Sequence, residues 1–239
     1  MKRLWALLPL AALSLLLVTA PSSAASDTAC IGTVTGTHEN VVVPPGQTCV
    51  ISAATVRGNV KALENSRLRI TMSIVRGNVE GDKADLVQIV SSRVGGNIAV
   101  KEGGPPVQVA PGFTGCASAA GISTPCEVFI TSTKVKGNIQ IEKMHGTVWV
   151  TDNVAPNPIK GNVKVEDNFV SPAEEFIFVS RNEVTQNVQV FKNTGPGRKR
   201  ISENVVRQSL QCFENDPVFI GAPNVARDAE GQCGATPLP

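Results

Sequence analysis

One five-residue phrase recurs along the 239-residue chain and constrains the fold more than any other feature. In each copy two aliphatic residues enclose a variable residue and a Gly-Asn pair, as in Val75-Arg76-Gly77-Asn78-Val79. Copies recur every 19 to 25 residues, with one interval of 41 that contains a Gly/Pro/Ala-rich insertion. A fixed period in this range is typical of repeat proteins whose units stack on one another. The marking asparagines are Asn59, Asn78, Asn97, Asn138, Asn162 and, in a degenerate copy, Asn187.

Around each copy the apolar residues alternate with polar ones, as at Val128 and Ile130 or Val148 and Val150. A period of two is strand spacing, and no amphipathic helix pattern follows the first 25 residues. Such short units cannot bury an apolar face alone, so they must stack with parallel strand pairing. We therefore predict an all-β parallel β-helix of about seven to nine coils.

Polar residues should line up at the bends of such a solenoid. The Gly-Asn asparagines are expected to form a ladder, each side-chain amide bonding to its neighbours above and below. Glycine and asparagine suit these bends because both tolerate left-handed backbone conformations. A second polar column is predicted two residues before each phrase, at Ser73, Ser92, Thr133, Asn157, Asn182 and Asn204.

These repeats resemble the right-handed parallel β-helix of the pectin-lyase-like superfamily, and more closely small secreted bacterial proteins built on Val-x-Gly-Asn-Val coils. The resemblance spans about Cys30 to Cys233 and includes the Asn-rich, Cys-containing C-terminal segment. It implies a right-handed solenoid but no particular activity. A left-handed β-helix is the structural alternative, less favoured because it needs strict hexapeptides and 19 is not a multiple of six.

The first 25 residues have the organisation of a secretory signal peptide: Lys2-Arg3, an apolar run to Ala20, then small residues. An uncleaved membrane anchor is the alternative reading. We predict one β-helix domain over residues 26–239, with an insertion at 103–125 and a C-terminal disulfide cap at about 204–239. Because Lys2 and Arg3 account for the formal charge of +2, nucleic acid is not an expected partner.

Six cysteines suit an oxidising compartment and can all pair. Fifteen pairings are possible, and the grouping in sequence favours neighbours. No Cys-x-x-Cys spacing occurs and only two histidines are present, so we expect neither a metal nor a cofactor. The favoured disulfides are Cys30 with Cys49, Cys116 with Cys126, and Cys212 with Cys233.

Two outward-facing columns are candidate binding surfaces. The second position of each phrase repeats cations at Arg57, Arg76, Lys136 and Lys160, and an anionic polymer lying along the rod would relieve their repulsion. Alternatively, these side chains extend into water and keep the rod soluble. The second column carries the aromatic residues Phe129, Trp149 and Phe178, which either stack on a sugar polymer or lie under the 103–125 insertion.

No catalytic motif is evident. Glu142 and Glu166 are expected on adjacent coils, but nearby Lys143 and Lys164 favour a salt-bridged surface over a catalytic carboxylate pair. We predict a secreted or cell-envelope β-helix module of bacterial type that is monomeric or stacks end to end. Its expected role is structural, or the binding of a cell-envelope polysaccharide or other anionic polymer. A polysaccharide lyase or glycoside hydrolase is the alternative.

Overall fold

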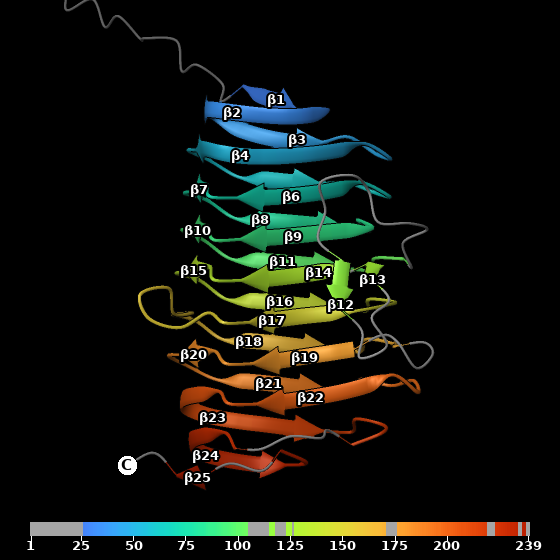
Figure 1. The fold of residues 1–239 in the computed structure, drawn as a ribbon, viewed down its shortest axis with the longest axis vertical. Helices are drawn as coiled ribbons and strands as arrows, with labels where there is room; N and C mark the ends of the chain where they lie inside the picture. Colours follow the sequence, from blue (N-terminus) through green and yellow to red (C-terminus); the bar gives the residue numbers. More distant parts are fainter. Residues whose placement is uncertain are drawn as a thin grey trace, which may run out of the picture.

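The computed structural model describes residues 26–104, 115–117, 123–125, 127–170, 176–218, 223–233 and 236–237. These residues form an all-β parallel solenoid of about eight turns (Figure 1). In Figure 1 the chain descends while it runs leftward along the front and rightward along the back, which is a right-handed coil. The predicted fold class is therefore confirmed. The predicted signal peptide, residues 1–25, lies outside the described residues.

The strands form three faces, which we name front, short-strand and back; in the coil of β17 and β18 the isolated bridge residue Ile159 takes the place of the short strand. The front strands are β2 (Gly32–His38), β4 (Thr48–Val56), β6 (Arg67–Thr71), β9 (Leu86–Val90), β14 (Val128–Thr131), β17 (Val148–Thr151), β19 (Phe176–Ser180) and β22 (Arg198–Ser202). The short-strand face holds the end of β4, then β7 (Ile74–Val75), β10 (Arg93–Val94), β15 (Lys134–Val135) and β20 (Glu183–Val184).

The back face is the longest ladder of parallel strands. Its strands are β1 (Asp27–Ala29), β3 (Asn40–Val43), β5 (Val60–Ala62), β8 (Val79–Asp82), β11 (Ile98–Lys101), β16 (Ile139–Glu142), β18 (Val163–Glu166), β21 (Val188–Phe191), β23 (Val205–Phe213), β24 (Val225–Gly231) and β25 (Thr236–Pro237). Within the insertion, β12 (Gly115–Ala117) and β13 (Ser123–Pro125) form a separate antiparallel pair.

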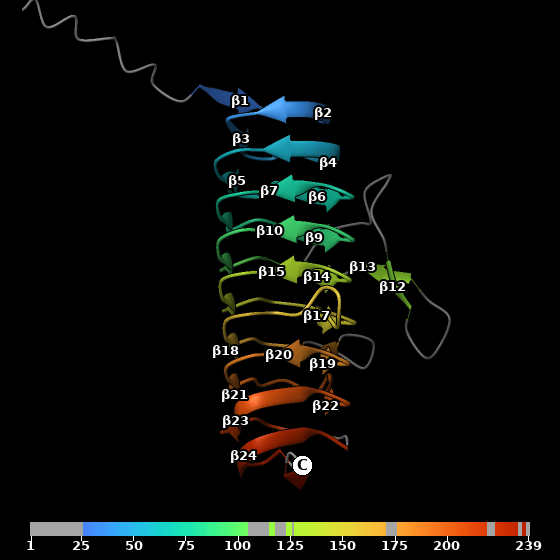
Figure 2. The same cartoon turned by 90° about the vertical axis from the view of Figure 1, so that its left-hand side faces the viewer.

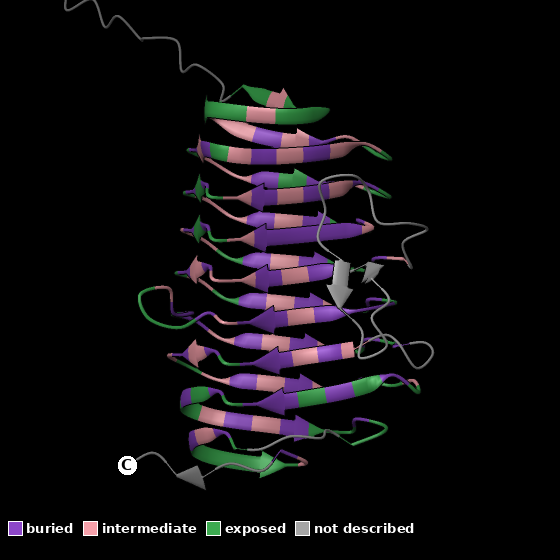
Figure 3. Cartoon of the chain, in the orientation of Figure 1, coloured by how far each residue is buried: buried purple, intermediate pink, exposed green. Residues whose placement is uncertain are grey.

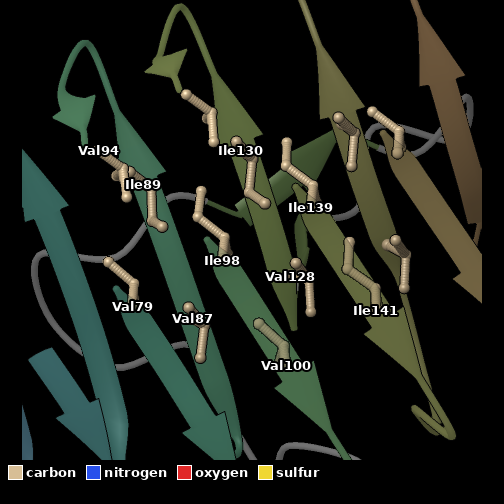
Figure 4. Close-up of a cluster of buried hydrophobic side chains, with 14 of the residues drawn as sticks. Val79, Val87, Ile89, Val94, Ile98, Val100, Val128, Ile130, Ile139 and Ile141 are labelled. Atoms are coloured by element: carbon tan, nitrogen blue, oxygen red, sulfur yellow. The ribbon is translucent and has the colours of Figure 1, made fainter. Parts of the chain in front are cut away.

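Alternation along each strand builds the core. In β14, Val128 and Ile130 are fully buried while the residues next to them are half exposed, and the same banding repeats down the rod (Figure 3). Parallel register places Val128 between Val87 and Val148, so aliphatic side chains stack from coil to coil. Figure 4 shows these valines and isoleucines pointing toward one another between the faces. The apolar pairs read from the sequence are thus the core.

The Gly-Asn corners, between the short-strand and back faces, form the expected ladder, but most rungs join a backbone N–H to a side-chain oxygen and not two side-chain amides. The backbone N–H of Asn78 donates to Asn59 Oδ1 at 2.8 Å, and Asn97 N–H donates to Asn78 Oδ1 at 2.8 Å. Across the insertion, Asn138 N–H donates to Asn97 Oδ1 at 2.8 Å. Side-chain amides bond to one another only lower down, at Asn162 and Asn187 among the described rungs. The ladder therefore couples side chain to backbone.

The expectation of left-handed backbone at the Gly-Asn pairs was wrong. A Cβ on Gly161 would lie 2.5 Å from Asn138 Oδ1 and 2.5 Å from the Gly137 carbonyl oxygen. Glycine is required there because the preceding rung approaches so closely, not because φ is positive. The left-handed residues lie at the other two corners: Ala53, Met72, Ser91, Ser132, Asp152, Arg181 and Glu203 at one, and Asn65, Lys83, Glu102, Lys143, Asp167, Lys192 and Glu214 at the other.

The second polar column follows the left-handed residues between the front and short-strand faces. Ser73, Ser92 and Thr133 lie in it, but Asn157 does not: Asn153, which directly follows the left-handed Asp152, takes that place. Asn157 belongs to a longer loop and donates to the Ser132 carbonyl at 3.2 Å. The column continues downward through Asn182, Asn204 and Asn224.

A third polar column, at the corner between the back and front faces, was not predicted. Asn168, Asn193 and Asn215 are buried there, and each side-chain amide donates to the next. Gln232 closes the column by accepting from Asn215 Nδ2 at 3.0 Å. Higher up, the same corner holds Ala84, Gly103 and Met144, which explains why no asparagine period was visible.

Two of the three predicted disulfides are confirmed. Cys30–Cys49 ties together the first coils and Cys212–Cys233 the last ones, with Cα atoms 5.5 and 5.4 Å apart. Cys126 lies outside the described residues, so the pair with Cys116 stays a prediction. Both confirmed bridges join neighbouring coils near the ends of the rod, where strand edges lack a further partner. None of the described segments is a helix long and apolar enough to cross a membrane.

Candidate functional site

The short-strand face presents two outward positions per coil. One is the first residue of the short strand and the other lies two residues later, directly before the Gly-Asn pair. The residue between them points into the core, so Val75, Val94 and Val135 are at most 1% exposed. Strands β7, β10 and β15 pair in register and lie one below another on the side that faces the viewer in Figure 2.

A hollow of about 430 Å³ lies on this face, over β7, β10 and β15. Gly95 occupies the position at which the coils above and below carry Arg76 and Lys136. A Cβ there would clash with the Arg76 carbonyl oxygen, so the backbone of the two coils lies close and no side chain stands between these two cations. Arg93 and Lys134 occupy the neighbouring outward positions and line the same hollow. We call this surface the Gly95 hollow. Its lining is Ile74, Val75, Arg76, Arg93, Val94, Gly95, Lys134 and Lys136, four cations and no acid.

The cations at the two ends of the column form ion pairs, whereas those in the middle form none in the described part of the chain. At the upper end Arg57 pairs with Glu39 at 2.8 Å, and at the lower end Arg207 pairs with Glu183 at 3.0 Å. Among the residues that the structure describes, the four cations of the Gly95 hollow form no ion pair, and neither does Lys160 in the next coil. The predicted residues Arg76, Lys136 and Lys160 thus keep their charges available, whereas Arg57 does not.

Sequence reasoning missed Arg93 and Lys134. Both begin a short strand, and the alternation Arg93-Val94-Gly95 and Lys134-Val135-Lys136 places them on the same side as the cation column. That alternation was a usable signal. What the sequence did not give is the role of Gly95, which looked like a gap in a charged column and is instead the floor of the hollow.

The aromatic row is confirmed as one outward column on the front face. Phe129 lies opposite Trp149, and Trp149 opposite Phe178, with ring centroids 6.0 and 5.3 Å apart. All three residues are half-buried. The Arg200 guanidinium lies 5.5 Å from the Phe178 ring centroid and extends the row downward. The insertion that was expected to cover the row lies mostly outside the described residues, although Figure 2 places β12 and β13 on this side of the rod.

A second hollow, of about 400 Å³, lies beside the lower end of this row. It is lined by Phe176, Phe178, Arg198, Lys199 and Arg200. Arg200 already pairs with Glu203 at 3.6 Å. This hollow is therefore less purely cationic than the Gly95 hollow.

Glu142 and Glu166 lie opposite each other on β16 and β18, as expected, and Lys164 bridges them. Lys164 Nζ lies 3.1 Å from Glu142 Oε1 and also contacts Glu166, while Lys101 lies 3.6 Å from Glu142. Burial would raise the pKa of Glu142, but hydrogen bonds from Gln140 and Lys164 and the lysine charges outweigh it and lower that pKa. A carboxyl group held ionised in this way is unsuited to act as a general acid.

A histidine and an aspartate can act together in catalysis, but His145 and Asp152 contact different residues. The His145 ring lies 6.0 Å from the Phe169 ring, whereas Asp152 accepts hydrogen bonds from Arg181 at 2.6 and 3.1 Å. No group of three or more potential metal ligands occurs in the part of the chain that the structure describes.

No protein-family model, curated protein or solved structure matches this chain. The likeness to pectin-lyase-like β-helices therefore rests on the repeat and the parallel solenoid alone, and such a likeness concerns fold and not activity.

Proposed function

We propose that this protein is a secreted or cell-envelope binding module that holds an anionic polymer along its short-strand face and catalyses no reaction. One observation carries the proposal: four cations line the Gly95 hollow without an acidic partner in the described structure. Like charges on adjacent coils, about 4.8 Å apart, repel one another. A polyanion along the face would remove that repulsion and gain from every cation it contacts.

The length of the unpaired region suggests how much polymer is held. From Arg76 to Lys160 the free cations span four consecutive coils, which is about 14 Å along the rod at strand spacing. The ion pairs Arg57–Glu39 and Arg207–Glu183 limit the region at its two ends. A segment with three or four anionic groups would fill it, and binding should weaken with added salt because the contacts are exposed.

Export is supported by the sequence of residues 1–25 and by the two disulfides, which persist in oxidising compartments. We expect the protein to be monomeric and of bacterial type, in line with the resemblance. The enzymatic alternative, a polysaccharide lyase or glycoside hydrolase, has weaker support because Lys164 forms ion pairs with both members of the best-placed carboxylate pair.

The proposal can be tested with protein that is expressed with its signal segment and purified after export. Binding to dextran sulfate, polygalacturonate and neutral dextran is measured by biolayer interferometry at low and physiological salt. We expect binding to anionic chains only, and roughly tenfold weaker binding for Lys136→Gln/Lys160→Gln. The matched control Arg57→Gln/Arg207→Gln removes the same charge from the same column but from paired residues, so it should change binding less than twofold.

Two results would refute the proposal. Equal losses in the two double variants would mean that only net charge matters. Release of new reducing ends from any of these chains, abolished by Glu142→Gln, would show that the protein is an enzyme.

A further inference from the structure

We infer that the Gly95 hollow is a seat for a tetrahedral oxyanion, a phosphate or sulfate ester carried by the bound polymer. This inference rests on the proposed function and specifies which anionic group the site prefers. A flat, uniformly charged face would accept any polyanion, but the short-strand face is interrupted at one coil.

The shape of the hollow is the first argument. Within the unpaired cation column only Gly95 lacks a side chain, and the cations above and below it, Arg76 and Lys136, remain. The stretch without a side chain is one coil high along the rod, so it suits a compact group that projects from a polymer. The exposed side chain of Ile74 adds an apolar wall, against which the carbon atoms next to an ester can rest.

The number and origin of the donors form the second argument. Arg76, Arg93 and the pair Lys134 and Lys136 come from three successive coils, and all of these side chains only donate hydrogen bonds. A carboxylate offers two oxygens in one plane, whereas a phosphate or sulfate ester offers three terminal oxygens in a tetrahedral arrangement. Donors that surround a hollow from several coils match the tetrahedral group better.

The backbone does not compete for this role. Gly95 N–H donates to the Val75 carbonyl at 2.8 Å, and Lys136 N–H donates to the Val94 carbonyl at 3.0 Å, so both amides belong to the ladder between coils. Recognition must therefore come from side chains on a rigid floor. Replacing those side chains should remove selectivity without unfolding the coil, because Arg93 is exposed and Lys134 is half exposed.

The test is a competition experiment on the full exported protein bound to fluorescent dextran sulfate. Sodium phosphate, sodium sulfate and sodium acetate are compared as competitors at equal ionic strength, made up with sodium chloride. We expect phosphate and sulfate to displace the polymer at concentrations at least about fivefold lower than acetate. The two arms separate the sources: raising the pH from 6 to 8 should strengthen competition by phosphate, which gains charge near pH 6 to 7, and leave sulfate unchanged.

Variants assign the preference to the hollow. Arg93→Gln/Lys134→Gln should abolish the difference between sulfate and acetate, while Arg57→Gln/Arg207→Gln should keep it. Equal competition by acetate, or a preference that survives in Arg93→Gln/Lys134→Gln, would overturn the inference while leaving polyanion binding intact. Failure to bind any polyanion would instead overturn the proposed function and this inference with it.

Discussion

The buried asparagine column between the back and front faces makes a quantitative prediction. Asn193 is fully buried and makes four side-chain hydrogen bonds that connect three coils. Its Oδ1 accepts from the backbone and side chain of Asn168 at 3.2 and 2.8 Å, and its Nδ2 donates to Asn215 Oδ1 at 2.9 Å and to the Val165 carbonyl at 3.0 Å. Asn193→Ala deletes all four and leaves the Asn168 backbone N–H buried without an acceptor.

The expected cost follows from these contacts. At about 1 kcal/mol net for each hydrogen bond, and somewhat more for the orphaned donor, Asn193→Ala should lower the free energy of unfolding by about 3 to 5 kcal/mol. The matched control is Asn97→Ala in the Gly-Asn ladder. Asn97 is exposed, and its Oδ1 accepts one bond, from Asn138 N–H at 2.8 Å. Water can replace that bond, so about 1 kcal/mol or less is expected.

Urea unfolding with the disulfides intact, followed by circular dichroism at 218 nm, measures both variants against the parent protein. The comparison uses transition midpoints at unchanged slope, since a changed slope would indicate partial unfolding of the repeat. If Asn193→Ala costs no more than Asn97→Ala, the buried column does not stabilise the rod and the reasoning from hydrogen-bond satisfaction is refuted.

Three further predictions concern other parts of the rod. Gly161→Ala should cost more than about 2 kcal/mol in urea unfolding, because its Cβ would press on the rung above; a neutral result would contradict the close-approach argument. Lys199 lies at a core position opposite Ile177 and donates to the carbonyls of Gly195, Gly197 and Asp216. Lys199→Met should therefore lower the free energy of unfolding by about 2 kcal/mol or more. Unchanged thermal stability of this variant would contradict the stabilising role of these hydrogen bonds. Hydrogen bonds from Arg181 hold the pKa of Asp152 below its usual value. The pair therefore stabilises the fold above pH 4, and this stabilisation is lost as the pH falls. Asp152→Asn should lower the free energy of unfolding by less than about 1 kcal/mol at pH 7 and not at all near pH 2.

Much of the fold was accessible from sequence because every coil carries the same marker. The Gly-Asn pair fixes the period, and alternation around it fixes which residues face inward, so the core and the aromatic row follow directly. The second polar column failed at Asn157 because the loop after Asp152 changes the count of residues in that coil, which shifts the corner position to Asn153.

The candidate site was harder to predict than the fold. A column of cations is visible in the sequence, but whether each cation is neutralised depends on neighbours in adjacent coils, such as Glu39 beside Arg57. The Gly95 hollow combines residues of three coils, and the coil of Gly95 is separated from the coil of Lys136 by an interval of 41 residues in the Asn ladder. Only the stacked structure brings these residues to one place.

The salt dependence of polyanion binding tests the central claim most directly. The affinity for dextran sulfate is measured from 50 to 300 mM sodium chloride for the parent protein, for Arg76→Gln/Arg93→Gln/Lys134→Gln/Lys136→Gln, and for the control Arg57→Gln/Arg207→Gln. Because each lost contact removes roughly 0.7 to 0.9 from the slope of log affinity against log salt, the quadruple variant should lose about three units and the control less than one. An unchanged slope in the quadruple variant would show that the polymer does not bind at the Gly95 hollow.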